Sequence, residues 1–332
     1  MPSQPPVSGI LGSVKKHIYI YSPSSAVRDK AAFKRGISRL EALGYAVEVD
    51  EGALSSHLRF AGDDESRLAA IHRAANSGAD IALISRGGYG LSRILAAIDY
   101  PLVANAIGDG TQFVGFSDFT AFQMALLAKT GATSWAGPAL GEDFGASTGS
   151  DDIMEACFDD LVTGQGEGTG WKLPKAAISP TATPPNDPSI NHLNNTYSIE
   201  NAVLWGGNLT MLASLSGTPF LPVVKGGILF IEDVGEHPYR IERMLAQLLQ
   251  AGILGQQKAI IFGQFSNYQL TPHDKGYKLA SVVGWLQIQV SAKILTGLPF
   301  GHVATKVLLP VGLSVTLAVE ERDAFLLWGH QH

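Results

Sequence analysis

Short apolar segments alternate with helical patterns over residues 17–130, and this alternation constrains the fold more than any other feature of the chain. The apolar segments have the length of strands, and the helical patterns repeat their apolar residues every three or four positions. Strands that alternate with helices predict an α/β domain with a doubly wound parallel sheet, because each helix returns the chain to the same end of the sheet. The predicted strands are 17–21, 45–49, 79–84 and 113–116.

The last of these strands runs into a serine. A helical pattern begins at Asp118, so Ser117 lies where a strand turns into a helix. Such a position lies at the carboxyl edge of the sheet, where a serine can act as a nucleophile beside the free N–H groups of the helix start. The alternative is that Ser117 or Asp118 only caps the helix. The G-x-S-x-G motif is incomplete, because Phe119 replaces its second glycine.

A glycine-rich loop, residues 86–90 (Arg-Gly-Gly-Tyr-Gly), follows the strand at 79–84. Ligands of parallel sheets bind beyond the carboxyl ends of the strands, so this loop and Ser117 are expected to converge. The loop can supply an oxyanion N–H or cradle a phosphate, but it lacks the G-x-G-x-x-G spacing and a Walker lysine. The alternative is a turn that needs positive φ.

The chain is predicted to form two domains. Residues 1–16 are rich in Pro, Ser and Gly and predict a disordered tail, and residues 17–162 form the N-terminal domain. Residues 163–198 have little periodicity and contain Ser-Pro, Pro-Pro and Asp-Pro steps, which predicts a linker and an exposed loop. A second alternating region predicts a smaller, strand-rich C-terminal α/β domain over residues 199–332.

Three shorter patterns complete the predicted elements. Residues 92–98 carry a helical pattern in the N-terminal domain. Gly206, Gly207 and Asn208 predict a tight turn. Residues 306–309 predict a strand near the end of the chain.

Composition excludes several classes of function. The net charge of −6 gives no basic footprint for nucleic acid. The single Cys157 excludes an internal disulfide and a multi-cysteine metal site, and no His/Glu motif has metal-ligand spacing. No apolar run is long enough to cross a membrane, and Lys15 and Lys16 stand in the wrong order for a secretory signal. We expect a cytoplasmic protein without cofactor or metal that binds neither nucleic acid nor membrane.

Three polar positions can form a nucleophile, base and acid set. Ser117 is the candidate nucleophile, His302 the candidate base, and Glu232 or Asp233 the candidate acid. A hydroxyl needs a base to take its proton, and the base needs an acid to fix its tautomer and stabilise the imidazolium. Adjacent residues of a strand face opposite sides, so at most one of the two carboxylates points into a shared pocket. His237 is the rival base.

An ordered set of motifs resembles the LD-carboxypeptidases, the S66 serine peptidases that also include the microcin C self-immunity proteins. The order and approximate spacing agree from about residue 17 to residue 328. Two departures bear on substrate choice: Ala136 precedes Gly137-Pro138 where many members have histidine, and the 163–198 loop differs. The motifs are Ser22-Pro23-Ser24-Ser25, residues 86–90, residues 115–121, Gly137-Pro138, Gly206-Gly207-Asn208-Leu209, residues 229–236, residues 238–241 and Gly301-His302.

The resemblance implies a Ser-His-Glu triad made of Ser117, His302 and Glu232. It thereby favours Glu232 over Asp233 and His302 over His237. The implied reaction is cleavage of the L–D peptide bond that links terminal D-alanine to a murein tetrapeptide during cell-wall recycling. The resemblance also implies a homodimer.

Further roles follow from the same resemblance. The backbone N–H groups of Gly88 and Asp118 are the expected oxyanion hole. Arg240 is expected to help bind the substrate, and the alternative is a surface residue at a helix start.

Two other functions compete with this one. The same triad can hydrolyse a peptidyl-nucleotide amide, as in the microcin C branch, if an aromatic side chain stacks on the adenine of the nucleotide. The candidates for that contact are Trp205, which we also expect at the substrate, Trp171 and Tyr197. The non-enzyme alternative is a two-domain protein that closes on a small anionic ligand at residues 86–90.

Overall fold

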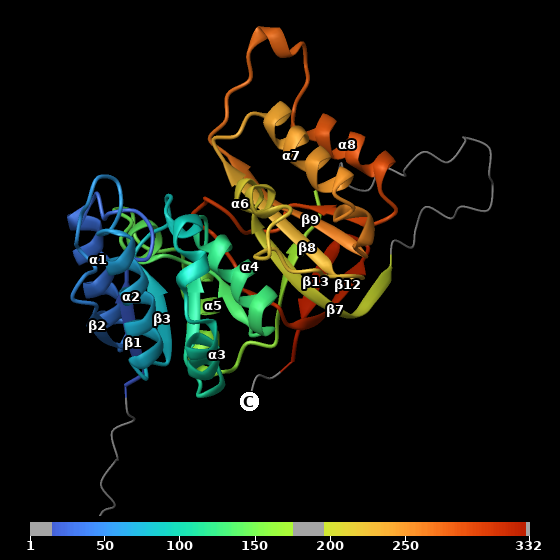
Figure 1. The fold of residues 1–332 in the computed structure, drawn as a ribbon. Helices are drawn as coiled ribbons and strands as arrows, with labels where there is room; N and C mark the ends of the chain where they lie inside the picture. Colours follow the sequence, from blue (N-terminus) through green and yellow to red (C-terminus); the bar gives the residue numbers. More distant parts are fainter. Residues whose placement is uncertain (1–14, 175–195, 330–332) are drawn as a thin grey trace, which may run out of the picture.

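The computed structural model describes residues 15–174 and 196–329. Of the predicted tail, only Lys15 and Lys16 belong to these residues. Figure 1 shows two α/β units side by side, the N-terminal one in blue to green and the C-terminal one in yellow to red. The fold class predicted from the alternation is confirmed. In the described residues, no helix combines the length and the apolar character that crossing a membrane requires.

The N-terminal sheet has six strands in the order β11-β5-β4-β3-β1-β2. All neighbouring pairs are parallel except β11 and β5. The middle strand β3 is buried throughout, which explains its continuous apolar sequence. The strands are β1 (His17–Tyr21), β2 (Ala46–Val49), β3 (Ile81–Ile84), β4 (Gln112–Gly115), β5 (Ser134–Ala136) and β11 (Leu309–Val311).

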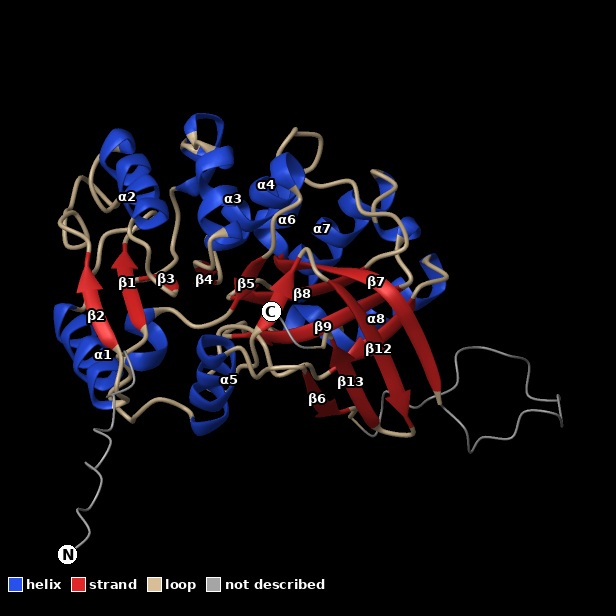
Figure 2. Cartoon of the chain, turned by 90° about the horizontal axis from the view of Figure 1, so that it is seen from below, coloured by secondary structure: helices blue, strands red, loops and turns tan. Residues whose placement is uncertain are grey.

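Helices cover both faces of this sheet, as Figure 2 shows: α2, α3 and α4 lie on one face, and α1 and α5 on the other. An aspartate side chain caps the first turn of α1, α2, α3 and α5 by accepting a backbone N–H. Helix α4 has no such cap. The helices are α1 (Lys30–Ala42), α2 (Asp64–Asn76), α3 (Tyr100–Gly108), α4 (Phe119–Thr130) and α5 (Asp152–Thr163).

The C-terminal sheet has seven strands in the order β10-β9-β8-β7-β12-β13-β6. The pairs from β10 to β7 are parallel, and those from β7 to β6 are antiparallel. The edge strands approach each other where Trp171 Nε1 donates to Thr296 O at 3.2 Å, so the sheet is curled. Its elements are β6 (Gly168–Lys172), β7 (Tyr197–Asn208), β8 (Ile228–Val234), β9 (Ala259–Ser266), β10 (Lys293–Thr296), β12 (Ser314–Glu320), β13 (Asp323–Leu327), α6 (Leu209–Leu215), α7 (Pro238–Gln250) and α8 (Leu279–Gln289).

Four local predictions differ from the structure. Residues 168–172, inside the predicted linker, form β6 because they pair with β13. Residues 206–208 continue β7 instead of turning. The strand predicted at 306–309 begins only at Leu309 and joins the N-terminal sheet. Residues 92–98 form two short 3₁₀ turns instead of one helix. The predicted loop also covers residues 175–195, which lie outside the described residues.

The two units meet along α4. This helix is buried over its first two turns and contacts α6 and β7 of the C-terminal unit. Thr120 Oγ1 accepts the backbone N–H of Asn208 at 3.0 Å. The contact needs a glycine before Asn208, because a Cβ on Gly207 would lie 2.5 Å from Thr120 Oγ1. Helix α4, which starts after Ser117, is therefore held against strand β7 of the C-terminal unit.

Candidate active site

The serine turn between β4 and α4 has an unusual backbone. Ser117 has a φ of +64°, a left-handed conformation that costs energy for a residue with a Cβ. Gly87 of the glycine-rich loop packs directly on it, since a Cβ on Gly87 would lie 2.8 Å from Ser117 Cβ. The predicted convergence of loop and serine is confirmed. This sharp strand-to-helix turn presents a side chain in the manner of a nucleophile elbow.

Helix capping does not explain Ser117 and Asp118. The Asp118 side chain makes no capping hydrogen bond to α4. Its Oδ2 instead accepts Ser24 Oγ at 2.8 Å and the Leu91 backbone N–H at 3.0 Å. Burial raises the pKa of the Asp118 carboxyl, although these two hydrogen bonds act to lower it. Asp118 thus connects the turn with two neighbouring loops.

Two hydrogen bonds join the three predicted residues. Nε2 of His302 lies 3.1 Å from Ser117 Oγ, and Nδ1 lies 2.8 Å from Glu232 Oε2. Glu232 is fully buried in β8, whereas a fifth of the His302 side chain is exposed. The serine and the histidine are 185 positions apart in the chain. The arrangement suits proton transfer from a hydroxyl to an imidazole that a carboxylate orients.

The two adjacent carboxylates have different partners. Asp233 accepts the backbone N–H of Thr210 at 2.9 Å and its hydroxyl at 2.8 Å. Asn208 lies between the two acids, and its Nδ2 donates to Glu232 at 3.1 Å and to Asp233 at 3.0 Å. Asp233 thus serves the start of α6, and burial raises its pKa despite these donors. Only Glu232 reaches His302.

The rival histidine is elsewhere. His237 caps α7, and its Nε2 lies 3.2 Å from Asp274 Oδ2. Its partners do not include Ser117, which is paired with His302. The histidine favoured by the resemblance is therefore the one that the fold brings to the serine.

The expected oxyanion donors are both backbone N–H groups. Gly88 has a φ of +102°, and a Cβ there would lie 2.3 Å from Ser25 Oγ, so only glycine fits. Within residues 15–174 and 196–329, neither the Gly88 N–H nor the Asp118 N–H donates to another backbone group. Among these residues no backbone acceptor competes for the two N–H groups, and the oxyanion hole stays a prediction.

Models of one protein family match both units of the chain. Residues 18–137 match the LD-carboxypeptidase N-terminal domain, and residues 201–317 match the LD-carboxypeptidase C-terminal domain. This chain belongs to the LD-carboxypeptidase family. It is therefore an enzyme, an S66 serine peptidase, and the family resemblance noted in the sequence is confirmed. The two-domain binding protein is no longer needed as an alternative.

Two curated relatives span nearly the whole LD-carboxypeptidase chain. The probable murein peptide carboxypeptidase of Bacillus subtilis is 30% identical over 291 residues, which cover 86% of this chain and 84% of that protein. The murein tetrapeptide carboxypeptidase of Pseudomonas aeruginosa is 26% identical over 326 residues, which cover 96% and 98%.

Solved structures share the fold. The muramoyltetrapeptide carboxypeptidase from Oxalobacter formigenes aligns with a TM-score of 0.80 and 39% identity, covering 95% of this chain and 99% of that one. MccF in complex with glutamyl sulfamoyl guanosine aligns with a TM-score of 0.80 and 22% identity, covering 96% and 98%. At that identity the likeness to MccF concerns the fold alone.

The weaker binding predictions have mixed outcomes in this LD-carboxypeptidase. Arg240 lies half-exposed in the first turn of α7, with its Nη1 3.7 Å from Glu236 Oε2. Trp205 is only 1% exposed, and its Nε1 donates to Gln257 in the core. A ligand contact by Trp205 does not fit this burial. Trp171 is buried as well, and Tyr197 is partly buried beside Lys293.

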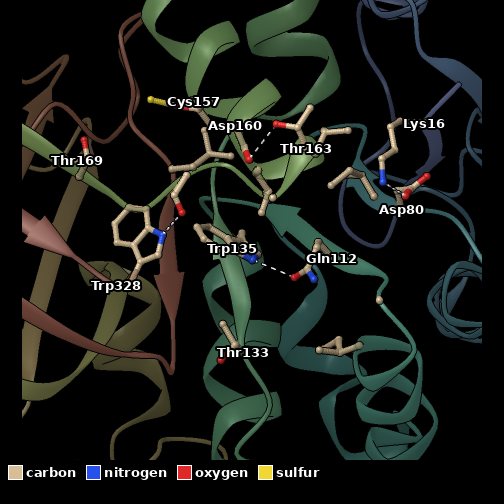
Figure 3. Close-up of a pocket in the computed structure, with 18 of the residues that line it drawn as sticks. Lys16, Asp80, Gln112, Thr133, Trp135, Cys157, Asp160, Thr163, Thr169 and Trp328 are labelled. Atoms are coloured by element: carbon tan, nitrogen blue, oxygen red, sulfur yellow. Dashed lines mark hydrogen bonds and ion pairs between the residues drawn. The ribbon is translucent and has the colours of Figure 1, made fainter. Parts of the chain in front are cut away.

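A cavity of about 450 Å³ lies at the opposite edge of the N-terminal sheet, where its strands begin (Figure 3). Polar groups in its wall pair with one another: Lys16 with Asp80 at 2.7 Å, and Trp135 Nε1 with Gln112 at 3.0 Å. None of the triad residues lines it. Among the described residues, no group of three or more His, Cys, Asp or Glu is placed to hold a metal ion.

Sequence reasoning missed two features near the triad. Asn208, which bridges both acids, stands in the Gly-Gly-Asn motif, so that motif was the available signal. Lys306, four residues after His302, forms a buried ion pair with Asp143. These two residues are 163 positions apart, and no local pattern connects them.

Proposed function

We propose that this LD-carboxypeptidase cleaves the L–D peptide bond that links terminal D-alanine to a murein tetrapeptide. Ser117 is the nucleophile, His302 the general base and then acid, and Glu232 the residue that orients the histidine. The observation that carries this proposal is the continuous hydrogen-bonded chain from Ser117 Oγ through both nitrogens of His302 to Glu232. The names of the relatives from Pseudomonas aeruginosa and Oxalobacter formigenes support the choice of substrate.

In the proposed reaction, Ser117 Oγ attacks the carbonyl carbon of the scissile bond while His302 Nε2 takes the hydroxyl proton. The oxyanion accepts hydrogen bonds from the N–H groups of Gly88 and Asp118. The imidazolium returns the proton to the amine of D-alanine, which leaves, and an acyl-serine remains. Water activated by His302 then hydrolyses that ester and restores the hydroxyl.

The buried acid is held from two sides. Glu232 Oε2 faces His302, while Oε1 accepts Asn208 Nδ2 at 3.1 Å. Both carboxylate oxygens are therefore engaged, which restrains rotation of the carboxylate away from the imidazole. This arrangement supports Glu232 as the group that selects the histidine tautomer with Nδ1 protonated.

Substrate binding requires cationic groups, because a murein tetrapeptide ends in a carboxylate. We propose Arg240 as one contact, since its guanidinium is half-exposed at the start of α7 and its ion pair with Glu236 is long, at 3.7 Å. Arg240→Met should then raise KM with little change in kcat. A raised KM that is reproduced by Arg243→Met, one turn further along α7, would argue against a specific contact.

The direct test uses L-Ala-γ-D-Glu-meso-diaminopimelate-D-Ala and follows free D-alanine by mass spectrometry. Wild type should release D-alanine, and Ser117→Ala should lower the rate by several powers of ten. His237→Ala is the matched control and should keep its activity, because His237 pairs with Asp274 and not with the serine. Release that persists in Ser117→Ala would contradict the nucleophile assignment.

Two further peptides define the substrate. A tetrapeptide that ends in L-alanine tests the stereochemistry of the bond, and one with lysine as third residue tests the preference at that position. If wild type leaves all murein peptides intact but cleaves an aminoacyl sulfamoyl adenosine, the peptidyl-nucleotide alternative replaces the proposed substrate.

The homodimer and the cytoplasmic location stay predictions. Sedimentation velocity across a range of concentrations measures the first, and a monomer at micromolar concentration would contradict it. Fractionation of cells that express the full chain measures the second.

A further inference from the structure

A buried ion pair lies behind the histidine loop, defined here as residues 301–306. Lys306 Nζ is 2.5 Å from Asp143 Oδ1, and the two side chains are only 2% and 4% exposed. Asp143 belongs to the π-helical turn Leu140–Phe144 of the N-terminal unit, and its Oδ2 accepts the Ala139 N–H at 2.8 Å. The pair therefore fastens the end of the histidine loop to the unit that carries the serine.

The pair also approaches the histidine through one aromatic ring. Lys306 Nζ lies 4.0 Å from the centre of the Phe116 ring, and the same ring lies beside His302, with ring centres 4.9 Å apart. The ammonium is thus no more than about 9 Å from the imidazole centre. Phe116 directly precedes Ser117, so contacts of this one ring link the lysine, the serine turn and the histidine.

We infer that Lys306 and Asp143 are positioning residues. They hold His302 against Ser117 across the two units, and their opposite charges largely cancel at the imidazole. The inference rests on the proposed role of His302 as general base. A salt bridge at this depth is a poor source of stability, since replacing both partners by apolar groups is often neutral. Its place near His302 favours a role in positioning the base.

The sign of the field follows from the charges. With both partners present, the ammonium and the carboxylate oppose each other at the imidazole. Removing the carboxylate leaves a cation that disfavours the imidazolium. Removing the ammonium lets the buried carboxyl take up a proton, so that little charge remains near the imidazole. Burial already raises the pKa of Asp143, and Lys306 is the main group that opposes this effect.

Other charges of the site stay unchanged in such an experiment. They are Glu232, which pairs with His302, Asp233 beside it on β8, and Glu142, which adjoins Asp143 and pairs with Arg86 at 3.5 Å. Lys306 and Asp143 are the pair that can be changed without touching a hydrogen bond of the triad. This makes the field of the pair measurable by itself.

The test follows the ¹⁵N signals of the His302 ring by NMR as the pH changes, in the full chain. Asp143→Asn should move the titration midpoint down, and Lys306→Met should leave it closer to the wild-type midpoint than Asp143→Asn does. Asp143→Asn/Lys306→Met should return it to the wild-type midpoint. Thr305→Val is the matched control: it removes the hydrogen bond of 2.7 Å from the same loop to Asp151 but no charge, so the midpoint should stay.

A second readout separates positioning from field. The rate at which a fluorophosphonate labels Ser117 should fall about tenfold or more in the double variant, although its midpoint is restored, because the anchor is lost. Lys306→Arg, which keeps the charge, should label faster than Lys306→Met. The double variant contains no unpaired charge, so it gives an answer even if a single variant fails to fold.

Two outcomes would overturn the inference: equal midpoints in wild type and Asp143→Asn, or a double variant that labels as fast as wild type. Neither readout uses a murein peptide, so wild type that labels at Ser117 but releases no D-alanine refutes only the proposed substrate. Wild type that does not label at Ser117 refutes the proposed nucleophile.

Discussion

The serine turn and the histidine loop meet at one hydrogen bond, but they are held in different ways. The serine turn is held within its own unit by the φ of +64° at Ser117, the close approach of Gly87 and the hydrogen bonds of Asp118. The histidine loop has no regular structure, and besides Ser266 of its own unit it is held by side chains of the other unit. Thr305 and Lys306 reach Asp151 and Asp143, at 2.7 and 2.5 Å.

This difference shows which part of the site depends on the docking of the two units. The backbone of the serine turn is set by β4, α4 and the loop at 86–90, all within the N-terminal unit. The base reaches the serine only when the histidine loop packs on that unit. Changes in the serine turn should therefore act through local geometry, whereas changes in the histidine loop and its acid should act through the charge and orientation of the imidazole.

The largest effect is expected at the acid that orients the base. Glu232→Gln should lower kcat/KM by about 10⁴-fold, because the amide cannot stabilise the imidazolium and favours the wrong tautomer. The matched control is Asp233→Asn on the same strand, whose partners are Thr210 and Asn208. It should lose less than about tenfold. Steady-state release of D-alanine measures both, and a larger loss in Asp233→Asn would reverse the assignment of the acid.

A smaller loss is expected from crowding the serine turn. In Gly87→Ala, the new Cβ would lie 2.9 Å from Ser117 Oγ, so the loop or the serine must shift. A displacement near 1 Å lowers kcat/KM by about 10²-fold. Gly108→Ala at the end of α3 is the control, since its Cβ meets nothing within 4 Å. Equal activity in the two alanine variants would mean that the serine turn accommodates the added methyl group without displacing Ser117.

The strain at the serine itself should appear in stability. Ser117→Gly should be more stable than Ser117→Ala by about 1 kcal/mol, because glycine adopts positive φ without a steric penalty. Both variants lack the hydroxyl, so the lost hydrogen bond to His302 cancels in the comparison. Urea denaturation measures the difference. Equal unfolding free energies would mean that the left-handed turn is not strained.

Features that depend on nearby residues could be predicted from the sequence. Strands β1, β2, β3 and β4 of the N-terminal sheet follow from short apolar segments, and α7 follows from its helical spacing. The residues buried in α7 include Ile241, Met244, Leu245 and Leu248, which recur in the sequence at helical spacing. Helix α3 was missed, although Asp99 and Pro101 are ordinary signals of a helix start.

Features that depend on distant pairing could not be predicted from pattern. Strand β6 lies in a segment rich in glycine and is a strand because β13 pairs with it. Strand β11 leaves the C-terminal unit to pair with β5. Alternation limited the acid to one of Glu232 and Asp233, but only the family resemblance favoured Glu232. Nothing local connects Lys306 with Asp143.

The smallest effect concerns the pH dependence of stability at Asp118, which ties the serine turn to the loops at Ser24 and Leu91. Burial raises the pKa of this carboxyl above 3.8, so its contribution to stability is complete below that pH and is lost as the pH rises through the folded-state pKa. Asp118→Asn removes this dependence. Relative to wild type, the variant should therefore become steadily more stable as the pH rises from about 4.

Asp50 gives the opposite sign in the same unit. Burial acts to raise its pKa, but hydrogen bonds from Arg73, Tyr19 and the Gly52 N–H outweigh burial and lower it below 3.8. Asp50 thus stabilises the fold at neutral pH and loses this contribution on acidification, so Asp50→Asn should lose most stability at pH 7 and least near pH 3. Urea denaturation from pH 3 to 8 compares the two variants. If the unfolding free energies of wild type and Asp118→Asn change with pH in parallel, water or Arg67 offsets the effect of burial on the pKa of Asp118. The serine turn would then be better hydrated than the burial of Asp118 implies.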